Sequence, residues 1–150
     1  MAKVIPFTGD HVPGAQILQE IEVTVERLRS ILETAVIDLE PDGEGDLYLT
    51  GGLDFPIWIR LDHDRKTFEL FTFIRKVAAD AATVAVRLNE LNSNFALGQF
   101  HHLDDAIYSR HSVSFEGGLL PRQFVKTVRR FSGSFREAIS DMRDLLVGED

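Results

Sequence analysis

The second half of the chain holds the residue types that most often bind a metal ion. Three histidines and two aspartates lie close together there: His101, His102, Asp104, Asp105 and His111. Imidazole and carboxylate groups bind zinc or iron when their side chains converge on one point. Neighbouring residues of a strand point to opposite faces, so His101 and His102 diverge in the hairpin predicted here. We therefore expect no metal and no cofactor, and keep a small metal-binding protein or enzyme using these histidines as the alternative function.

Groups suited to covalent or phosphate chemistry are present without the partners that such chemistry needs. Ser112 and Ser114 follow His111, but neighbours along one strand do not bring a base within hydrogen-bonding distance of a hydroxyl. The glycine pairs at 51–52 and 117–118 lack the flanking pattern and the lysine of a phosphate-binding loop. The chain has no cysteine, which excludes disulfides and thiolate metal sites. We predict that the protein is not an enzyme.

The last helical stretch separates its charges along its length. Its first half is basic, with Arg122, Lys126, Arg129, Arg130 and Arg136, and its second half is acidic, with Glu137, Asp141 and Asp144. This arrangement opposes the helix dipole, which costs about a few tenths of a kcal/mol for each exposed charge. We predict that an acidic protein surface docks on Arg122, Lys126 and Arg129. The alternative is a solvated face paired with Glu26 or Glu33 of the first helix.

Residues 55–74 alternate in the way that predicts a β-hairpin. With a two-residue turn at His63-Asp64, Leu61 would pair with Lys66 and Ile59 with Phe68. This register places one apolar set on the face that helices can cover: Phe55, Ile57, Ile59, Phe68, Leu70 and Ile74. The residues between them point to the other face: Trp58, Arg60, Glu69, Phe71 and Phe73.

That second face carries more aromatic surface than a sheet face in contact with water normally does. We expect Tyr48, from the preceding strand, to join Trp58, Phe71 and Phe73 there. Trp and Tyr are common anchors of protein interfaces. We therefore predict that a partner protein, or a second copy in a homodimer, packs on these four side chains. The alternative is that residues before Thr24, or the end of the last helix, cover the rings.

The apolar spacing along the chain predicts the elements that hold these residues. Helices are expected at Thr24–Ala35, at Val77–Phe95 and from Pro121 to a stop at Gly148. Ser132-Gly133-Ser134 interrupts the last one, which we interpret as close packing or a slight bend, with a working hinge as the alternative. Strands are expected at Val36–Glu40, Asp46–Thr50, Phe55–Leu61, Lys66–Ile74, Leu97–Leu103 and Ala106–Phe115. Ile17–Val23 fits an extra helical turn or an edge strand.

Short turns between successive strands imply antiparallel pairing, so the fold class is α+β. We predict an antiparallel sheet with helices on one face, in the order α-β-β-β(-β)-α-β-β-α. The chain of 150 residues fits one domain, with residues 1–14 as a flexible tail and residues 15–147 as the globular part.

Charge and composition narrow the choice of partners and location. The formal net charge of −8 argues against nucleic acid and anionic membranes. The chain shows no basic-then-apolar leader and no run of about 18 apolar residues, so we expect neither a signal peptide nor a membrane span. With the absence of cysteine, this favours a cytoplasmic protein.

Four stretches resemble the YbjN family of bacterial sensory-transduction regulators, whose fold is like that of the type III secretion chaperones. They are Thr24–Ala35, Arg87–Asn92, Phe95–Phe100 followed by Leu103-Asp104-Asp105, and Leu119-Leu120-Pro121. Leu120 departs from the family pattern, which has a Thr or Ser cap before the proline. The resemblance spans about residues 23–147. It implies a small interaction or chaperone-like module without catalytic residues.

The residues and the resemblance lead to one main prediction of function. We expect a non-catalytic, chaperone-like or regulatory module that binds proteins and associates with itself. A purely structural subunit of a homo-oligomer is a further alternative.

Overall fold

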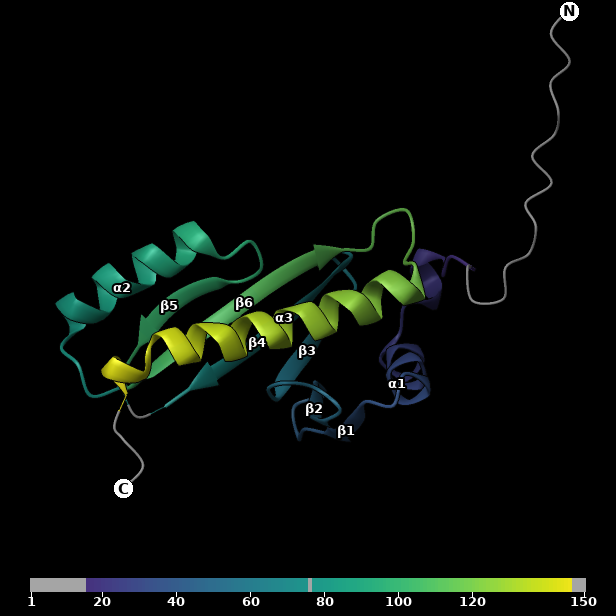
Figure 1. The fold of residues 1–150 in the computed structure, drawn as a ribbon. Helices are drawn as coiled ribbons and strands as arrows, with labels where there is room; N and C mark the ends of the chain where they lie inside the picture. Colours follow the sequence, from purple (N-terminus) through teal and green to yellow (C-terminus); the bar gives the residue numbers. More distant parts are fainter. Residues whose placement is uncertain (1–15, 76, 147–150) are drawn as a thin grey trace, which may run out of the picture.

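The computed structural model describes residues 16–75 and 77–146. Six strands form one antiparallel sheet, against which three α-helices pack (Figure 1). The strands lie side by side in the order β1-β2-β3-β4-β6-β5. Strands β4 and β6 are therefore direct neighbours in the sheet, although α2 and β5 lie between them in the sequence. This confirms the predicted α+β fold. The expected tail, residues 1–14, lies outside the described part of the chain.

The observed elements follow the predicted order. The helices are α1 (Val25–Thr34), α2 (Ala81–Asn94) and α3 (Pro121–Asp141), with 3-10 turns at Glu20–Glu22 and Arg143–Leu145. The strands are β1 (Asp38–Pro41), β2 (Leu47–Gly51), β3 (Ile57–Asp62), β4 (Thr67–Ile74), β5 (Gln99–Leu103) and β6 (Ala106–Ser114). Within residues 16–75 and 77–146, no helix is both long enough and apolar enough to cross a bilayer.

The segment before α1, which the sequence allows to be helix or strand, is a 3-10 turn preceded by one isolated bridge. Leu18 and Leu119 exchange two backbone hydrogen bonds, of 2.8 and 2.9 Å. The Glu20 carboxylate accepts a hydrogen bond from the Gly117 N–H and pairs with Lys66 Nζ, each at 2.7 Å. The Gly117 N–H and then Lys66 lower the pKa of Glu20, and Glu20 raises the pKa of Lys66. These contacts fasten the segment to the end of the sheet.

The hairpin of β3 and β4 has a register two residues away from the predicted one. Ile59 pairs with Leu70 rather than with Phe68. The connection takes the four residues 63–66 instead of two, and Lys66 adopts a left-handed conformation, with φ 52°. A slip of two residues leaves every side chain on its predicted face, because the alternation along a strand has a period of two.

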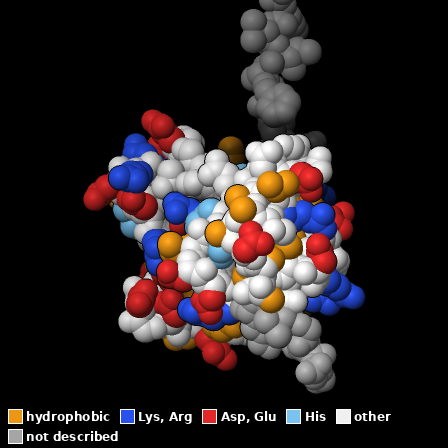
Figure 2. Space-filling model, turned by 90° about the vertical axis from the view of Figure 1, so that its left-hand side faces the viewer, with side chains coloured by type: hydrophobic (Ala, Val, Ile, Leu, Met, Phe, Trp, Pro, Cys, Tyr) orange, Lys and Arg blue, Asp and Glu red, His pale blue; other side chains and the backbone are white. Residues whose placement is uncertain are grey.

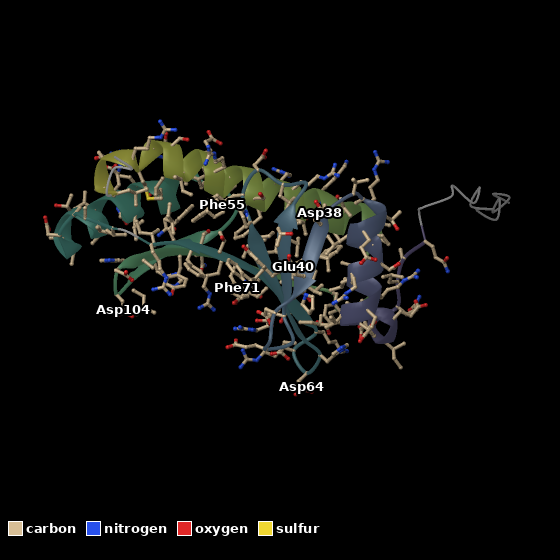
Figure 3. The ribbon with its side chains drawn as sticks, turned by 90° about the horizontal axis from the view of Figure 1, so that it is seen from below. Asp38, Glu40, Phe55, Asp64, Phe71 and Asp104 are labelled. Carbon is tan, nitrogen blue, oxygen red and sulfur yellow. The ribbon has the colours of Figure 1, made fainter. Side chains whose placement is uncertain are left out.

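The predicted partition of that hairpin between two faces is therefore confirmed for the strand residues. Ile57, Ile59, Phe68 and Leu70 are buried under the helices. Phe55 precedes β3 and packs against Phe135 of α3, with ring centroids 4.9 Å apart. Figure 3 shows Phe55 on the α3 side of the sheet and Phe71 on the opposite side.

The hairpin of β5 and β6 forms around Asp104-Asp105 as predicted. Leu103 pairs with Ala106 across a two-residue turn, and Asp104 has a φ of 55°. An aspartate tolerates this left-handed conformation better than most residues do.

Helix α2 begins at Ala81, four residues later than predicted. Asp80 is its N-cap, with Oδ1 accepting a hydrogen bond from the Thr83 N–H at 3.0 Å. Val77 instead forms a bridge with Leu146, near the end of the described chain. The predicted apolar stripe is confirmed at its centre, where three side chains are buried: Val84, Leu88 and Leu91.

Helix α3 starts at Pro121 as predicted and runs through Ser132-Gly133-Ser134 without a break. It ends at Asp141, so the predicted stop at Gly148 is wrong; Gly148 itself lies outside the described residues. The chain then forms the 3-10 segment Arg143–Leu145, after which Leu146 is extended and pairs with Val77.

Two buried clusters make up the core, and α3 crosses both. Phe124, Val128 and Phe131 belong to the cluster shared with α1 and β1–β4, whereas Phe135 and Ile139 belong to the cluster shared with α2 and β5.

The Ser-Gly-Ser motif falls at the junction of these two clusters. The buried Ser132 hydroxyl donates to the Phe55 carbonyl and accepts from the Phe55 N–H, both at 2.7 Å. The β2–β3 loop is thereby held against α3.

Candidate functional site

The face of the sheet that the helices leave open carries a continuous row of aromatic rings, which we name the aromatic ladder. It consists of Tyr48, Trp58, Phe71, Phe73, Tyr108 and His101, all of them half-buried. Tyr48 stacks on Trp58 with centroids 4.4 Å apart, and Trp58 stacks on Phe73 at 5.2 Å and on Phe71 at 5.9 Å. Phe73 contacts Tyr108 at 5.2 Å, and Tyr108 stacks on His101 at 5.3 Å.

Strand register builds this ladder. Tyr48 of β2 lies opposite Trp58 of β3, which lies opposite Phe71 of β4. Phe73 lies opposite Tyr108 of β6, and Tyr108 lies opposite His101 of β5. Directly opposed residues have Cβ atoms about 4.5–5.5 Å apart, so rings on successive strands must touch. The ladder therefore crosses five strands rather than following any one of them.

Arginine side chains border the rings and are already paired with carboxylates. The Arg60 guanidinium lies 4.9 Å from the Phe71 centroid and bonds Asp46, with Nη2 to Oδ2 at 2.7 Å. These hydrogen bonds are the main cause that raises the pKa of Arg60. Arg110 pairs with Glu69 at 3.0 Å. The border of the ladder thus carries both positive and negative charges, and the ring surface that it encloses is apolar.

Arg75 borders the other side of the ladder in the same way. Its guanidinium lies 5.4 Å from the Phe73 centroid and 3.4 Å from an Asp105 oxygen. A cation over a ring face contributes about 0.5–1 kcal/mol at an exposed site.

The two edge strands of the sheet are protected against an added strand. At one edge, β1 has four residues, is irregular between Asp38 and Leu39, and ends in Pro41, which lacks an N–H. At the other edge, the Asn92 amide donates to the Phe100 carbonyl at 3.0 Å and accepts from the Phe100 N–H at 2.7 Å. A partner strand would have to displace this side chain, which leaves the open face as the more accessible surface.

The structure separates the two sets of residues that the sequence assigns to partner binding. Tyr48, Trp58, Phe71 and Phe73 come together on the open face. Arg122, Lys126 and Arg129 are exposed on α3, on the helix-covered side of the molecule. Arg129 donates to the Ala35 carbonyl at the end of α1, at 2.8 Å. Within the described residues, none of these three cations forms an ion pair with Glu26 or Glu33.

The histidines point in different directions, as predicted for His101 and His102. His101 lies on the open face, and His102 lies opposite Ile107 on the covered face. His111 stacks on Phe131 beneath α3, with centroids 6.5 Å apart. Burial lowers the pKa of both His101 and His111, and Arg110 lowers that of His101 further. Across residues 16–75 and 77–146, no three His, Asp or Glu side chains come close enough to hold a metal ion together.

Tyr108 and His101 extend the ladder beyond the four predicted rings. The alternation of β6 already places Tyr108 away from Ile107 and Val113. The local pattern does not predict that β4 pairs with β6. This pairing places the β5–β6 hairpin beside the β3–β4 hairpin.

A six-stranded antiparallel sheet with three helices on one face is the architecture of the type III secretion chaperones. The chain belongs to the family described as T3SS (YopN, CesT) and YbjN peptide-binding chaperone 1, whose model matches residues 19–149. None of the curated proteins matches the sequence.

Two solved structures share this fold. The crystal structure of YbjN from E. coli is 18% identical in sequence, with a TM-score of 0.68, over 83% of this chain and 96% of that one. A chain of the HopA1–SchA chaperone–effector complex is 13% identical, with a TM-score of 0.50, over 79% of this chain and 88% of that one.

Proposed function

We propose that the protein is a non-catalytic, chaperone-like module that binds an extended, apolar segment of another polypeptide on the aromatic ladder. The observation that carries this proposal is the continuity of the ladder, whose rings touch from β2 to β5 on a face that no described element covers. Membership of a family described as peptide-binding chaperones supports it.

The geometry fits side-chain recognition rather than strand addition. Asn92 and Pro41 protect the sheet edges, whereas the rings offer stacking and apolar contact across the whole width of the sheet. The arginines beside the rings are already paired, so a ligand gains little from carrying charge. Aromatic and aliphatic side chains gain most, because stacking contributes about 0.5–1.5 kcal/mol beyond the burial of area.

A second copy of the chain is the second candidate for this surface. The surface beside the rings carries Arg60, Glu69 and Arg110, so both signs of charge are present. A two-fold axis through the ladder could therefore set rings against rings and arginine against glutamate, as a self-complementary interface requires.

The single tryptophan makes this proposal directly testable, because Trp58 lies in the ladder and is the chain's one indole fluorophore. We expect its emission to shift when an array of unlabelled peptides is titrated, with aromatic and aliphatic sequences binding and acidic ones not. Phe71→Ser should weaken this binding without unfolding the protein. Val86→Ser, which changes an exposed apolar residue of α2, is the matched control and should bind as the parent does.

Light scattering over a range of concentrations separates the two candidates. A dimer that dissociates in Phe71→Ser, together with no peptide binding, favours the second copy. Unchanged binding and mass, with a large fall in the melting temperature, would contradict both, because the rings would then be internal core.

A further inference from the structure

We propose that α3 carries a second interaction surface, separate from the aromatic ladder, that binds an extended acidic segment of a partner protein. We name it the basic stripe and define it as Arg122, Lys126, Arg129 and Arg136. It goes beyond the proposed function, since it uses other residues on the other side of the molecule.

The spacing of these residues places them in one line along the helix. They are separated by four, three and seven positions, with Gly133 between the last two, so they share one helical face. All four are exposed, and the buried residues of α3 occupy the opposite side. At 1.5 Å per residue the stripe is about 21 Å long.

Within residues 16–75 and 77–146, the stripe residues form no ion pair, although the protein is acidic overall. In the described residues, the arginines of the sheet and of α2 form ion pairs, among them Arg60, Arg87 and Arg110, whereas the stripe residues form none. Figure 2 shows the α2 end of the molecule, where acidic and basic side chains are interspersed.

Placing cations at the start of α3 also opposes its dipole. Arg122 is the second residue of the helix, and the first turn contains no acidic residue. A carboxylate bound at Arg122 would lessen this unfavourable interaction, and further carboxylates along the segment would balance the other three cations.

A protein segment fits this surface better than a nucleic acid or a membrane does. The rings of the aromatic ladder, which could stack on bases, lie on the opposite side of the sheet. The stripe is one helix wide, and the net charge of −8 repels a polyanion or an anionic bilayer that extends beyond it. A short acidic segment can be confined to the stripe.

The spacing also defines the pattern of the segment. Neighbouring side chains at i and i+4 lie about 5–6 Å apart on a helix, and alternate residues of an extended chain lie about 6.6 Å apart. Acidic residues at every second position, over about seven residues, span about 20 Å, which matches the length of the stripe, although the seven-residue step across Gly133 is wider than the others.

In the part of the chain that the structure describes, Asp54 lies beside the stripe without forming an ion pair with it, and its negative charge would repel an acidic segment bound there. A Cβ added at Gly133 would lie 3.0 Å from the Asp54 Oδ2 atom, so this carboxylate rests against the middle of the stripe. The hollow beside it is lined by Gly52, Leu53, Asp54 and Arg129.

The test measures binding of a fluorescein-labelled heptapeptide with glutamate at alternate positions and serine between them, using fluorescence anisotropy and the full-length protein at low salt. We expect saturable binding that weakens with added salt. Arg122→Glu/Lys126→Glu should reduce the affinity about tenfold or more. Asp54→Asn should increase it. Arg65→Glu/Arg143→Glu changes the net charge equally, away from the stripe, and is the matched control.

Thermal unfolding of the variants tests whether misfolding, rather than the changed charges, causes a loss of peptide binding. Because a glutamate near the start of α3 suits the dipole, Arg122→Glu/Lys126→Glu should melt at the parent's temperature or above it while losing the peptide. Equal losses in the stripe and control variants would overturn the proposal. The proposal would also be overturned if a single-stranded oligonucleotide, or vesicles containing phosphatidylserine, bound the protein more tightly than the acidic peptide does and the stripe variant lost that binding too.

Discussion

Val36 is a β-branched residue in a conformation that favours glycine. It has a φ of 60° and follows α1, where its N–H bonds Glu33 O and the next N–H, of Ile37, bonds Leu32 O. This is the Schellman ending of a helix, in which the residue at this position is usually glycine or asparagine. The valine side chain is 79% exposed, so little packing compensates for the strain.

We expect Val36→Asn and Val36→Gly to raise the free energy of unfolding by about 1 kcal/mol, since the left-handed conformation costs a side-chain-bearing residue about 1–2 kcal/mol. Urea denaturation measures the change. Val86→Gly, in the exposed middle of α2, is the control and should lower stability by about 0.5 kcal/mol. A loss at Val36 as well would contradict the observed ending of α1.

Ser132 shows a residue whose role the sequence does not reveal. The sequence indicates close packing, a slight bend or a hinge at the Ser-Gly-Ser motif, and in the structure the Ser132 hydroxyl satisfies both backbone groups of Phe55, in a different loop. This partner is 77 residues away in sequence, and no local pattern encodes it.

Ser132→Ala should lower the free energy of unfolding by about 1–3 kcal/mol, the usual cost of leaving buried polar groups unsatisfied. Ser134→Ala, in the same motif, should change it by less than about 0.5 kcal/mol. Chemical denaturation of both variants measures the difference. Equal effects would show that the loss comes from the helix itself and not from the bond to the loop.

At the scale of elements, the periodicity of the sequence predicts which face each strand residue occupies better than it predicts which residues pair. The sequence sorts the side chains of β3 and β4 onto their correct faces, because alternation is a local property. It misplaces the pairing by two residues, because loop length depends on the left-handed Lys66. It also starts α2 four residues early, because Val77 is apolar but pairs with Leu146 at the far end of the chain.

The edge formed by β5 gives a prediction at this scale. Asn92→Ala frees the Phe100 N–H and C=O groups, so we expect a loss of about 1–2 kcal/mol in stability. We also expect growth of the average mass with concentration, because an unprotected edge can pair with another strand. Asn89→Ala, one turn earlier on α2, is the control for chemical denaturation and light scattering. A variant that is less stable yet stays at the parent's mass would mean that Asn92 orders β5 without protecting it.

For the whole molecule, the sequence predicts which residues are outward-facing but not how the surfaces lie relative to each other. The four predicted rings do meet on one face, because the strands that carry them are neighbours. The full ladder depends on the pairing of β4 with β6, which follows from how α2 and β5 fold back. The placement of the ladder and the basic stripe on opposite sides depends on α3 covering the other face of the sheet (Figure 1).

The pH dependence of stability belongs to the whole molecule, because it adds contributions from distant groups. Burial lowers the pKa of His111 and His101 below the ordinary histidine value of about 6.5. Near this pH the unfolded chain binds more protons than the folded one, so stability falls as the pH drops below about 6.5. Glu20 and Asp80 act in a lower window, since their pKa values lie below 4.5 and 3.8 in the fold, so their contribution is lost as the pH falls below those values.

We therefore expect the free energy of unfolding to decrease between pH 7 and pH 5, and His111→Gln to reduce that decrease. The replacement removes a group whose charged form is disfavoured beneath α3, where it lies against Phe131. Because the ring contact is also lost, the variant will be less stable at pH 7, so the informative quantity is the difference between the two pH values in urea denaturation. His63→Gln, in the exposed β3–β4 loop, removes one histidine without changing the contact with Phe131 and is the matched control. An unchanged difference in His111→Gln would show that protonation beneath α3 does not set the acid sensitivity of the protein.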